Sequence, residues 1–205
     1  MEEHEVAWFS HLATTYRGTS RQVDASSPRS QEVRFEVIVD ALDSMLGARW
    51  GGMSLLDFGC GKGDFAAYLR RRGRLDGLRY VGVDGIEENV EDARRDVGGD
   101  FRMGRWDGSG RVIEDEIDLV VWSGTFAATR LERRPGMITS LLEQARVGVV
   151  GNFLTWTPGV DDWQGMVLMD PDDALRLVDR AAFRVQLRAD YLPHDFTLAA
   201  MRWNA

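Results

Sequence analysis

The spacing of hydrophobic positions separates an N-terminal helical segment from the rest of the chain. From Gln31 to Leu46 apolar residues recur every three or four positions, which predicts an amphipathic helix with Ser30 as its N-cap and Gly47 as its stop. A shorter amphipathic helix is expected over residues 2–15. The polar stretch 17–30, which is rich in turn formers, predicts a loop between the two helices.

From Ser54 onward, short apolar runs alternate with helical stretches, which is typical of repeated βα units and a parallel sheet. The expected strands are Ser54–Phe58, Arg79–Asp84, Asp100–Gly104, Ile117–Trp122 and Val147–Leu154. The expected helices cover 64–73, 87–97, 131–146 and, after an N-cap at Asp170 and a proline, Ala174–Ala181. Two alternating strands, Phe183–Tyr191 and Asp195–Trp203, predict a final antiparallel hairpin. The predicted fold is α/β: a Rossmann-like, seven-stranded, mostly parallel sheet with a C-terminal antiparallel hairpin and an N-terminal helical cap.

Length and composition favour one globular domain. The 205 residues, 44% of them hydrophobic, are too few for two ordinary domains and a linker, so residues 1–50 are expected to cap a core formed by 51–205. Because 25 basic and 33 acidic residues give a net charge of −8, a wide phosphate-binding surface is not expected.

The single cysteine excludes a disulfide framework and a multi-cysteine zinc site, so no metal is expected and a reducing compartment, the cytoplasm, is favoured. The sequence has no apolar run of membrane-spanning length. Its acidic start has the wrong charge for a secretory or transit peptide.

The sharpest local signal is Leu-Leu-Asp-Phe-Gly-Cys-Gly-Lys-Gly-Asp-Phe, which begins at Leu55. A buried strand ends in an acid, Asp57, and is followed by three alternating glycines, Gly59, Gly61 and Gly63. Glycines allow the backbone to come close to a ligand at the carboxyl edge of an open α/β sheet, which favours a ligand-binding loop here. The alternative interpretation of the motif is an ordinary strand-to-helix turn. Asp64 stands where the dinucleotide fingerprint needs its third glycine, and Lys62 is not followed by the Ser or Thr of a P-loop.

Two further acids follow the next strands. Asp84 ends the second strand in Tyr-Val-Gly-Val-Asp-Gly, where one carboxylate can bind two vicinal ribose hydroxyls. Asp107 follows the third strand in Arg-Met-Gly-Arg-Trp-Asp-Gly, for which a simple turn acid is the alternative interpretation.

At these residues the sequence resembles the class I S-adenosylmethionine (SAM)-dependent methyltransferases, from about Ser54 to the end. The resemblance implies that Asp57 and the three glycines line the methionine and ribose parts of SAM and that Asp84 holds the ribose hydroxyls. It also implies that Asp107, with Trp106 beside it, contacts the adenine, and it adds the loop residues Cys60 and Gly85 to the cofactor site. Four shorter motifs are similar to a group of small bacterial enzymes in this superfamily whose substrates are mostly unassigned: 30–35, 122–126, 152–154 and 191–197.

Other candidate residues come from the helix before the sheet and from the ends of later strands. Arg34 is a candidate partner for the cofactor's carboxylate, with a solvated helix arginine as the alternative. Trp122 and Ser123 end the fourth strand, where the superfamily places residues beside the transferred methyl, although such a tryptophan is often only core. Tyr191 and His194 are the candidate catalytic residues, because the hairpin turn is expected at the carboxyl edge. An imidazole can accept a proton near neutral pH, and a hydrogen-bonded turn histidine is the alternative for His194.

Missing motifs narrow the acceptor. The fourth strand is not followed by the Asn/Asp-Pro-Pro-aromatic sequence that superfamily members acting on base amino groups usually carry, and Cys60 is not the nucleophile of a cytosine-C5 enzyme. The loop from Trp156 to Trp163 could form an aromatic wall over a small acceptor or a lid that merely packs on the domain.

We therefore expect a methyltransferase that uses SAM, yields S-adenosylhomocysteine (SAH) and methylates oxygen or nitrogen of a small organic molecule by direct displacement, a reaction that can proceed with or without a dedicated base. The alternatives are a non-catalytic SAM-binding regulatory or interaction protein, an RNA or protein methyltransferase, and a nicotinamide-dependent dehydrogenase, which Asp64 disfavours. A monomer or homodimer without nucleic acid or membrane partners is expected.

Overall fold

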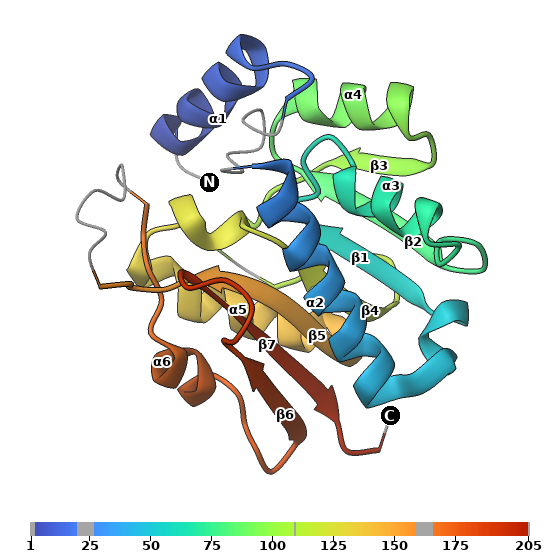
Figure 1. Ribbon diagram of the computed structural model, residues 1–205, viewed down its shortest axis with the longest axis vertical. Coiled ribbons are helices and arrows are strands. Elements are labelled where there is room, and N and C mark those ends of the chain that lie inside the picture. Colours follow the sequence, from blue (N-terminus) through green and yellow to red (C-terminus); the bar gives the residue numbers. More distant parts are fainter. Residues whose placement is uncertain (1–2, 20–26, 109, 159–165, 205) are drawn as a thin grey trace.

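A computed structural model describes residues 3–19, 27–108, 110–158 and 166–204. Within these residues seven strands form one sheet in the order β3-β2-β1-β4-β5-β7-β6 (Figure 1). The strands are β1 Ser54–Phe58, β2 Arg79–Asp84, β3 Asp100–Met103, β4 Ile117–Trp122, β5 Ala145–Leu154, β6 Phe183–Arg188 and β7 Asp195–Arg202.

Strand direction confirms the predicted topology. β3, β2, β1, β4 and β5 pair in parallel, whereas β7 is antiparallel to both β5 and β6. From β1 the chain adds β2 and then β3 on one side of the sheet, and β4 and then β5 on the other side. The strand order therefore reverses between β1 and β4. Open α/β sheets bind ligands at the carboxyl ends of the strands beside such a reversal. The Rossmann-like, mostly parallel seven-stranded sheet is confirmed, and its geometry directs attention to the edge where β1, β2 and β4 end.

Helices cover both faces of the sheet (Figure 1). They are α1 Glu3–Thr15, α2 Pro28–Leu46, α3 Asp64–Arg71, α4 Glu87–Asp96, α5 Arg134–Gln144 and α6 Pro171–Arg176. α2 runs across the front of the sheet in Figure 1 and α5 lies behind it. Arg17, just beyond α1, forms an ion pair with the buried Asp92 of α4, so α1 is held over α4.

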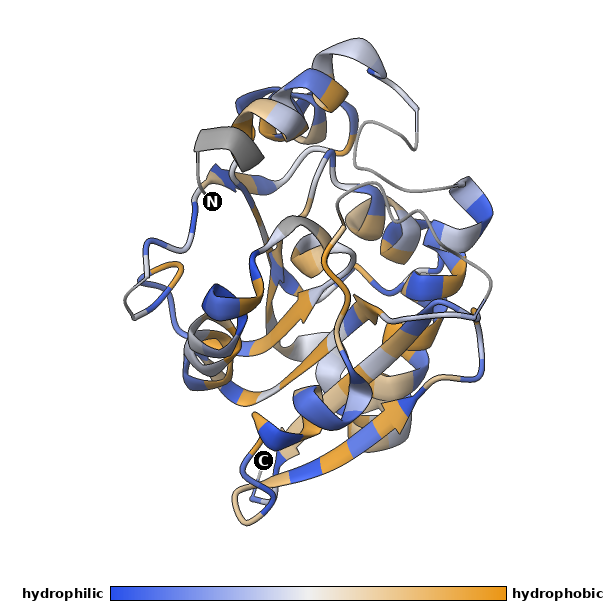
Figure 2. Ribbon diagram, turned by 90° about the vertical axis from the view of Figure 1, so that its left-hand side faces the viewer, coloured by the Kyte–Doolittle hydropathy of each residue, from blue (hydrophilic) through white to orange (hydrophobic). Residues whose placement is uncertain are grey.

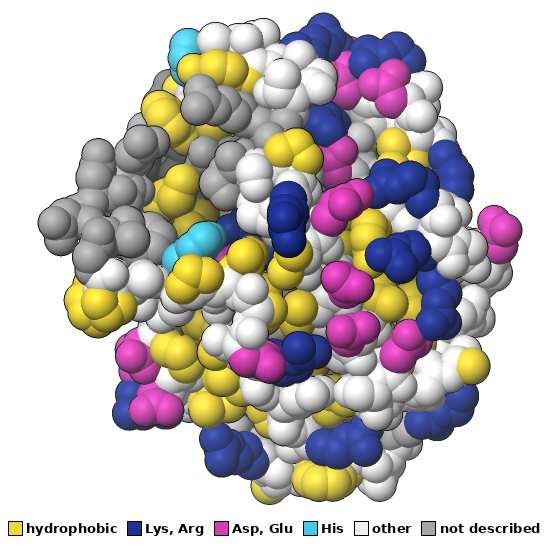
Figure 3. All heavy atoms as spheres, viewed as in Figure 1, with side chains coloured by type: hydrophobic (Ala, Val, Ile, Leu, Met, Phe, Trp, Pro, Cys, Tyr) yellow, Lys and Arg dark blue, Asp and Glu magenta, His cyan; other side chains and the backbone are white. Residues whose placement is uncertain are grey.

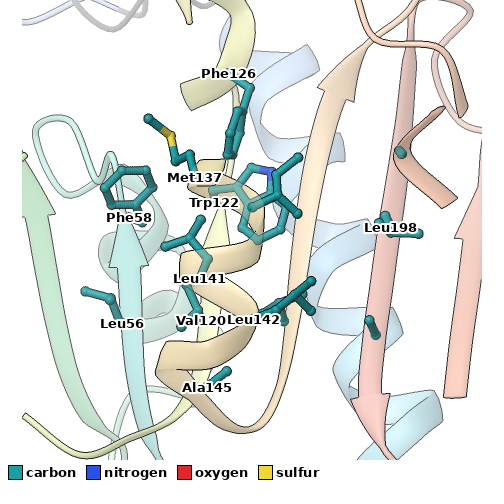
Figure 4. Packing of buried hydrophobic residues seen from close by; sticks show 14 of the residues in the cluster. Leu56, Phe58, Val120, Trp122, Phe126, Met137, Leu141, Leu142, Ala145 and Leu198 are labelled. Atoms are coloured by element: carbon teal, nitrogen blue, oxygen red, sulfur yellow. The ribbon is translucent and has the colours of Figure 1, made fainter. Parts of the chain in front are cut away.

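Two apolar cores follow from this layering, one on each face of the sheet. On the α2 face, Ile38 and Leu42 pack with Leu55, Leu119 and other buried residues. On the α5 face, the indole of Trp122 packs edge-on against Phe126, close to Met137 and Leu141 of α5 (Figure 4). The Trp122 indole also packs edge-on against Phe153 of β5. Apolar residues, orange in Figure 2, therefore line the sheet and the inner sides of its helices. Burial of this apolar surface is the main force that holds the layers together.

Several element ends differ from the sequence prediction. α2 begins at Pro28 with Ser27 as N-cap, and Ser30 is the third residue of the helix, where it completes a capping box with Ser27. A proline is favoured at the first helical position, which explains the earlier start. α5 begins at Arg134, after the 3-10 turn Leu131–Arg133, and ends at Gln144, where β5 follows directly.

Two predicted elements near the C-terminus, α6 and β6, are shorter than expected. α6 ends at Arg176, five residues before the predicted end, because the carbonyl and side chain of Asp179 accept hydrogen bonds from the backbone of residues 181–183 and form a turn. β6 ends at Arg188, so Tyr191 lies in the turn before β7. Across the described residues, no helix is long and apolar enough to cross a membrane.

Candidate functional site

The glycine loop between β1 and α3 is fixed to the end of β2. Gly59, Gly61 and Gly63 all have positive φ, at 76°, 54° and 83°, which L-residues with a side chain rarely adopt. The N–H groups of Gly59 and Cys60 donate to the carbonyl of Val83 at 2.8 and 3.1 Å. The loop therefore presents bare backbone at the carboxyl edge of the sheet.

The loop after β4 closes against this glycine loop. The Thr125 hydroxyl donates to the carbonyl of Phe58, the last residue of β1, at 2.8 Å. A Cβ atom on Gly59 would lie 2.4 Å from Thr125 Oγ1, well inside van der Waals contact. Only glycine fits at position 59, for reasons of both space and backbone conformation.

Asp84 ends β2 and is buried with both carboxylate oxygens engaged. Oδ2 accepts the N–H of Gly61 at 2.8 Å, and Oδ1 accepts the N–H of Ile86 at 2.9 Å and the Asn89 amide at 3.4 Å. Burial raises the pKa of Asp84, while the two backbone bonds oppose that rise by favouring the ionised form. Since a carboxylate oxygen can accept two hydrogen bonds, Oδ2 retains capacity for a ligand hydroxyl.

Asp57, at the carboxyl end of β1, is also buried and accepts a hydrogen bond from the Tyr80 hydroxyl. Burial raises the pKa of Asp57 to about 7, and the nearby carboxylates of Asp84 and Asp64 add to the rise, although the Tyr80 bond opposes it. A cation placed beside Asp57 would favour its charged form. Asp57, Asp84 and the glycine loop therefore lie at one edge of the sheet, as the sequence predicted.

Other predicted cofactor residues lie around this edge with varied exposure. The side chain of Cys60 is buried beside Phe101, and burial raises the pKa of its thiol. Gly85 is buried, and its carbonyl accepts two hydrogen bonds from Arg105 at 3.0 and 2.6 Å. Asp107 is exposed. Their contacts with a cofactor remain predictions.

The two predicted tryptophans belong to the core on the α5 face. The Trp106 indole is buried and donates to Ser140 Oγ of α5 at 3.0 Å. Trp122 is fully buried against Gly151, and its Nε1 has no hydrogen-bond partner among the residues that the structure describes. Ser123 directly follows Trp122 at the end of β4 and is half-buried.

Arg34 has a protein carboxylate as its partner. Its Nε and Nη2 donate to the two oxygens of Asp195, the first residue of β7, at 2.7 and 3.1 Å, and both residues are more than nine-tenths buried. From the sequence, the cofactor's carboxylate is the candidate partner of Arg34 and a solvated helix arginine is the alternative; the observed arginine is buried and not solvated. Asp195 was not among the residues singled out, although it stands within the motif at 191–197.

The turn before β7 brings Tyr191 and His194 to the carboxyl edge, as the topology predicted. Tyr191 bonds Thr197 at 2.8 Å and Asn152 at 3.4 Å, and burial raises the pKa of Tyr191 to about 12. Its phenol is therefore protonated at neutral pH and can donate a hydrogen bond. His194 is half-buried, and its carbonyl accepts the N–H of Thr155 at 3.0 Å. Of the predicted 156–163 loop, residues 159–163 lie outside the described residues; Trp156 is exposed, and the Thr157 hydroxyl donates to the carbonyl of Pro193 at 2.7 Å.

A comparison with models of protein families identifies the family to which the chain belongs. A model of the methyltransferase domain family matches residues 30–141, more than half of the chain and all of the glycine-loop, Asp84 and Asp107 region. The chain belongs to the methyltransferase domain family. The resemblance to class I SAM-dependent methyltransferases is thereby confirmed, and SAM is the cofactor of that class.

Solved structures confirm the fold of this methyltransferase domain. Magnesium protoporphyrin IX methyltransferase from Synechocystis PCC 6803, crystallised with SAH, superposes with a TM-score of 0.69 at 15% identity, over 96% of this chain and 98% of that one. A TehB-like SAM-dependent methyltransferase from Corynebacterium glutamicum gives 0.62 at 18% identity, over 96% and 98%. A curated relative, the 23S rRNA (uracil(1939)-C(5))-methyltransferase of Shewanella denitrificans, is 42% identical over 63 residues, 30% of this chain and 12% of that enzyme.

The residues at the edge fit SAM. SAM combines a ribose diol, a positively charged sulfur and an amino acid group. Asp84 retains an acceptor position for a ribose hydroxyl, the glycine loop leaves bare backbone beside it, and Asp57 offers a carboxyl group to positive charge. No cluster of three or more His, Cys, Asp or Glu side chains suited to a metal occurs within the described ranges.

Proposed function

We propose that the methyltransferase domain transfers a methyl group from SAM to oxygen or nitrogen of a small organic molecule. The observation that carries the proposal is the Asp84 carboxylate, fixed at the carboxyl end of β2 by the Gly61 and Ile86 amides beside three positive-φ glycines. In this proposal Asp84 binds the ribose hydroxyls, and Asp57 faces the positively charged part of SAM. When bound, SAM supplies a methyl group already activated on a sulfonium and leaves as SAH.

The protein's task in such a displacement is to align the acceptor with the methyl group and to exclude water. Thr125 fixes the loop after β4 against the glycine loop, so the end of β4 lies beside the proposed cofactor site. Ser123 at that strand end is proposed to lie next to the transferred methyl. Tyr191 is proposed to donate a hydrogen bond to the acceptor, because its raised pKa keeps the phenol protonated. His194 remains the proposed acceptor of a proton if one is needed.

A small acceptor is favoured over RNA by the charge of the protein. The chain carries a net charge of −8. On the face shown in Figure 3, basic and acidic side chains alternate and do not form a broad patch of one sign. RNA-binding surfaces depend on clustered positive charge to neutralise phosphates. We also propose residues 1–50 as an acceptor-side cap, the cytoplasm as the location, and a monomer or homodimer as the assembly.

Calorimetric titration with SAM, SAH and NAD tests cofactor choice, and incubation of the protein with methyl-labelled SAM and a metabolite extract tests turnover by mass spectrometry. We expect SAM and SAH to bind, NAD not to bind, and a labelled low-molecular-weight product to appear. NAD binding without SAM binding would refute the proposal. SAM binding without any labelled product would favour a non-catalytic SAM-binding protein, and label in added RNA would favour the RNA alternative.

A further inference from the structure

One polar side chain in the core lacks a hydrogen-bond partner for its acceptor atom. Asn152 of β5 is only 1% exposed. Its Nδ2 donates to Thr197 Oγ1 at 2.6 Å and to the Tyr191 hydroxyl at 3.4 Å, but within the described contacts its Oδ1 accepts no hydrogen bond. Burying an acceptor without a donor costs free energy, so native proteins rarely do it without a reason.

A count of hydrogens shows what the cluster Asn152, Thr197 and Tyr191 could bind. The two hydroxyl oxygens lie 2.8 Å apart, and one hydroxyl hydrogen lies between them. The second hydroxyl hydrogen has no acceptor among the contacts that the structure describes. The cluster therefore offers one unused acceptor, Asn152 Oδ1, and one unused donor hydrogen. A hydroxyl group on a ligand satisfies both, because it donates one hydrogen bond and accepts another.

The cluster lies on the acceptor side of the sheet. Asn152 stands opposite Thr197 in the β5–β7 register, two residues beyond the apolar Val150 that packs under α2. Trp122, the last residue of β4, pairs with Gly151, so Ser123, which directly follows β4, and Asn152 of β5 come next at the carboxyl edge. Asp84 is on β2, on the other side of β1 and β4, so the cluster and the proposed ribose site lie on opposite sides of the point where the strand order reverses.

We propose that Asn152, Thr197 and Tyr191 form the acceptor subsite and that it selects molecules bearing an alcohol or phenol hydroxyl. This inference rests on the proposed methyl transfer and adds the chemical class of the acceptor. In this proposal, Asn152 and Thr197 determine which acceptor molecules bind. The buried Arg34–Asp195 pair ties α2 to β7 at the same edge.

Phenol and anisole form a matched pair of probes, because anisole keeps the ring and the oxygen but lacks the hydroxyl hydrogen. Both are titrated into the full chain with and without SAH, and the Asn152 side-chain amide, assigned by its loss in Asn152→Leu, is followed by NMR. We expect phenol to shift this amide, anisole to bind at least about tenfold more weakly, and Asn152→Leu to lose the difference while its SAH affinity stays within about twofold.

Equal binding of the two probes, tighter binding of anisole, or no shift of the Asn152 amide by phenol would overturn the inference. These outcomes are separate from failure of the proposed function, which absence of SAH binding would reveal in the same samples.

A second measurement compares Asn152 with a buried amide that is fully bonded. Gln144 Oε1 accepts the N–H of Val112 at 2.9 Å, and its Nε2 donates to the carbonyls of Ile113 and Asp115 at 3.0 and 3.2 Å. Gln144→Leu leaves these groups unpaired and should lower the midpoint of thermal unfolding by about 5 °C or more. Asn152→Leu should lower the midpoint clearly less than Gln144→Leu, because it removes an unpaired acceptor together with the two hydrogen bonds that Nδ2 donates. An equal fall in both variants would mean that Asn152 is structural and would overturn the inference.

Discussion

Replacement of Arg34 by Met tests whether this arginine stabilises the folded protein or binds the cofactor. In the structure the Arg34 guanidinium and the Asp195 carboxylate are both more than nine-tenths buried and share two hydrogen bonds at 2.7 and 3.1 Å. Arg34→Met leaves the Asp195 charge buried without its partner, for which measured costs are about 3–5 kcal/mol. For a protein of this length that corresponds to a fall of about 10 °C in the unfolding temperature.

The double variant Arg34→Met/Asp195→Leu should recover most of that loss. An apolar pair of similar size is often as stable as a buried ion pair, so a double-mutant cycle should give a coupling of about 3 kcal/mol. The exposed pair Arg71–Glu32, at 2.7 Å and with both side chains more than half exposed, is the matched control. Arg71→Met should cost less than about 1 kcal/mol, because water screens exposed charges.

Urea unfolding and calorimetric titration with SAM are the assays for these variants. We expect Arg34→Met to lose stability and to retain SAM affinity within about threefold in the folded fraction. If Arg34→Met keeps its stability but loses SAM affinity, the ion-pair reasoning is refuted and the guanidinium holds the cofactor's carboxylate, as predicted from the sequence.

Three further substitutions test the proposed cofactor site. Asp84→Asn should weaken SAM binding by about tenfold to hundredfold in calorimetry, because hydrogen bonds to a charged carboxylate contribute more than neutral ones; unchanged affinity would exclude Asp84 from the ribose site. Because the pKa of Asp57 is raised to about 7, the folded state holds a proton that the unfolded state loses near pH 4, so this group lowers stability as pH rises from about 4 to 7. Asp57→Asn should therefore be more stable than the wild type at pH 8 by up to about 4 kcal/mol in urea unfolding, with no gain at pH 3, and an equal difference at both pH values would contradict the raised pKa. Gly59→Ala should unfold at a lower temperature than Gly73→Ala, because both glycines have positive φ but only Gly59 would place a Cβ against Thr125, and equal losses would show that the contact does not matter.

The sequence predicted best the central parallel strands, which are buried along most of their length. β1, β2 and β4 begin and end at the predicted residues, because buried strands of a parallel sheet are continuous apolar runs whose limits are visible in the sequence. Prediction was weaker where local hydrogen bonds set the boundary. Ser27 competes with Ser30 for the N-cap of α2, and the turn at Asp179 shortens α6 although the apolar pattern continues.

At the site, the sequence by itself determined which residues stand at the ends of β1 and β2. Asp57, the glycine loop and Asp84 meet at one edge because parallel strands place their carboxyl ends together, which follows from the order of elements alone.

Only the tertiary structure decided which side chains pair across distant elements. The Arg34–Asp195 ion pair joins residues 161 positions apart, and the cluster of Asn152, Thr197 and Tyr191 depends on the antiparallel register of β5 and β7. Strand register and side-chain direction arise from the packing of the whole sheet, and a linear pattern does not contain them.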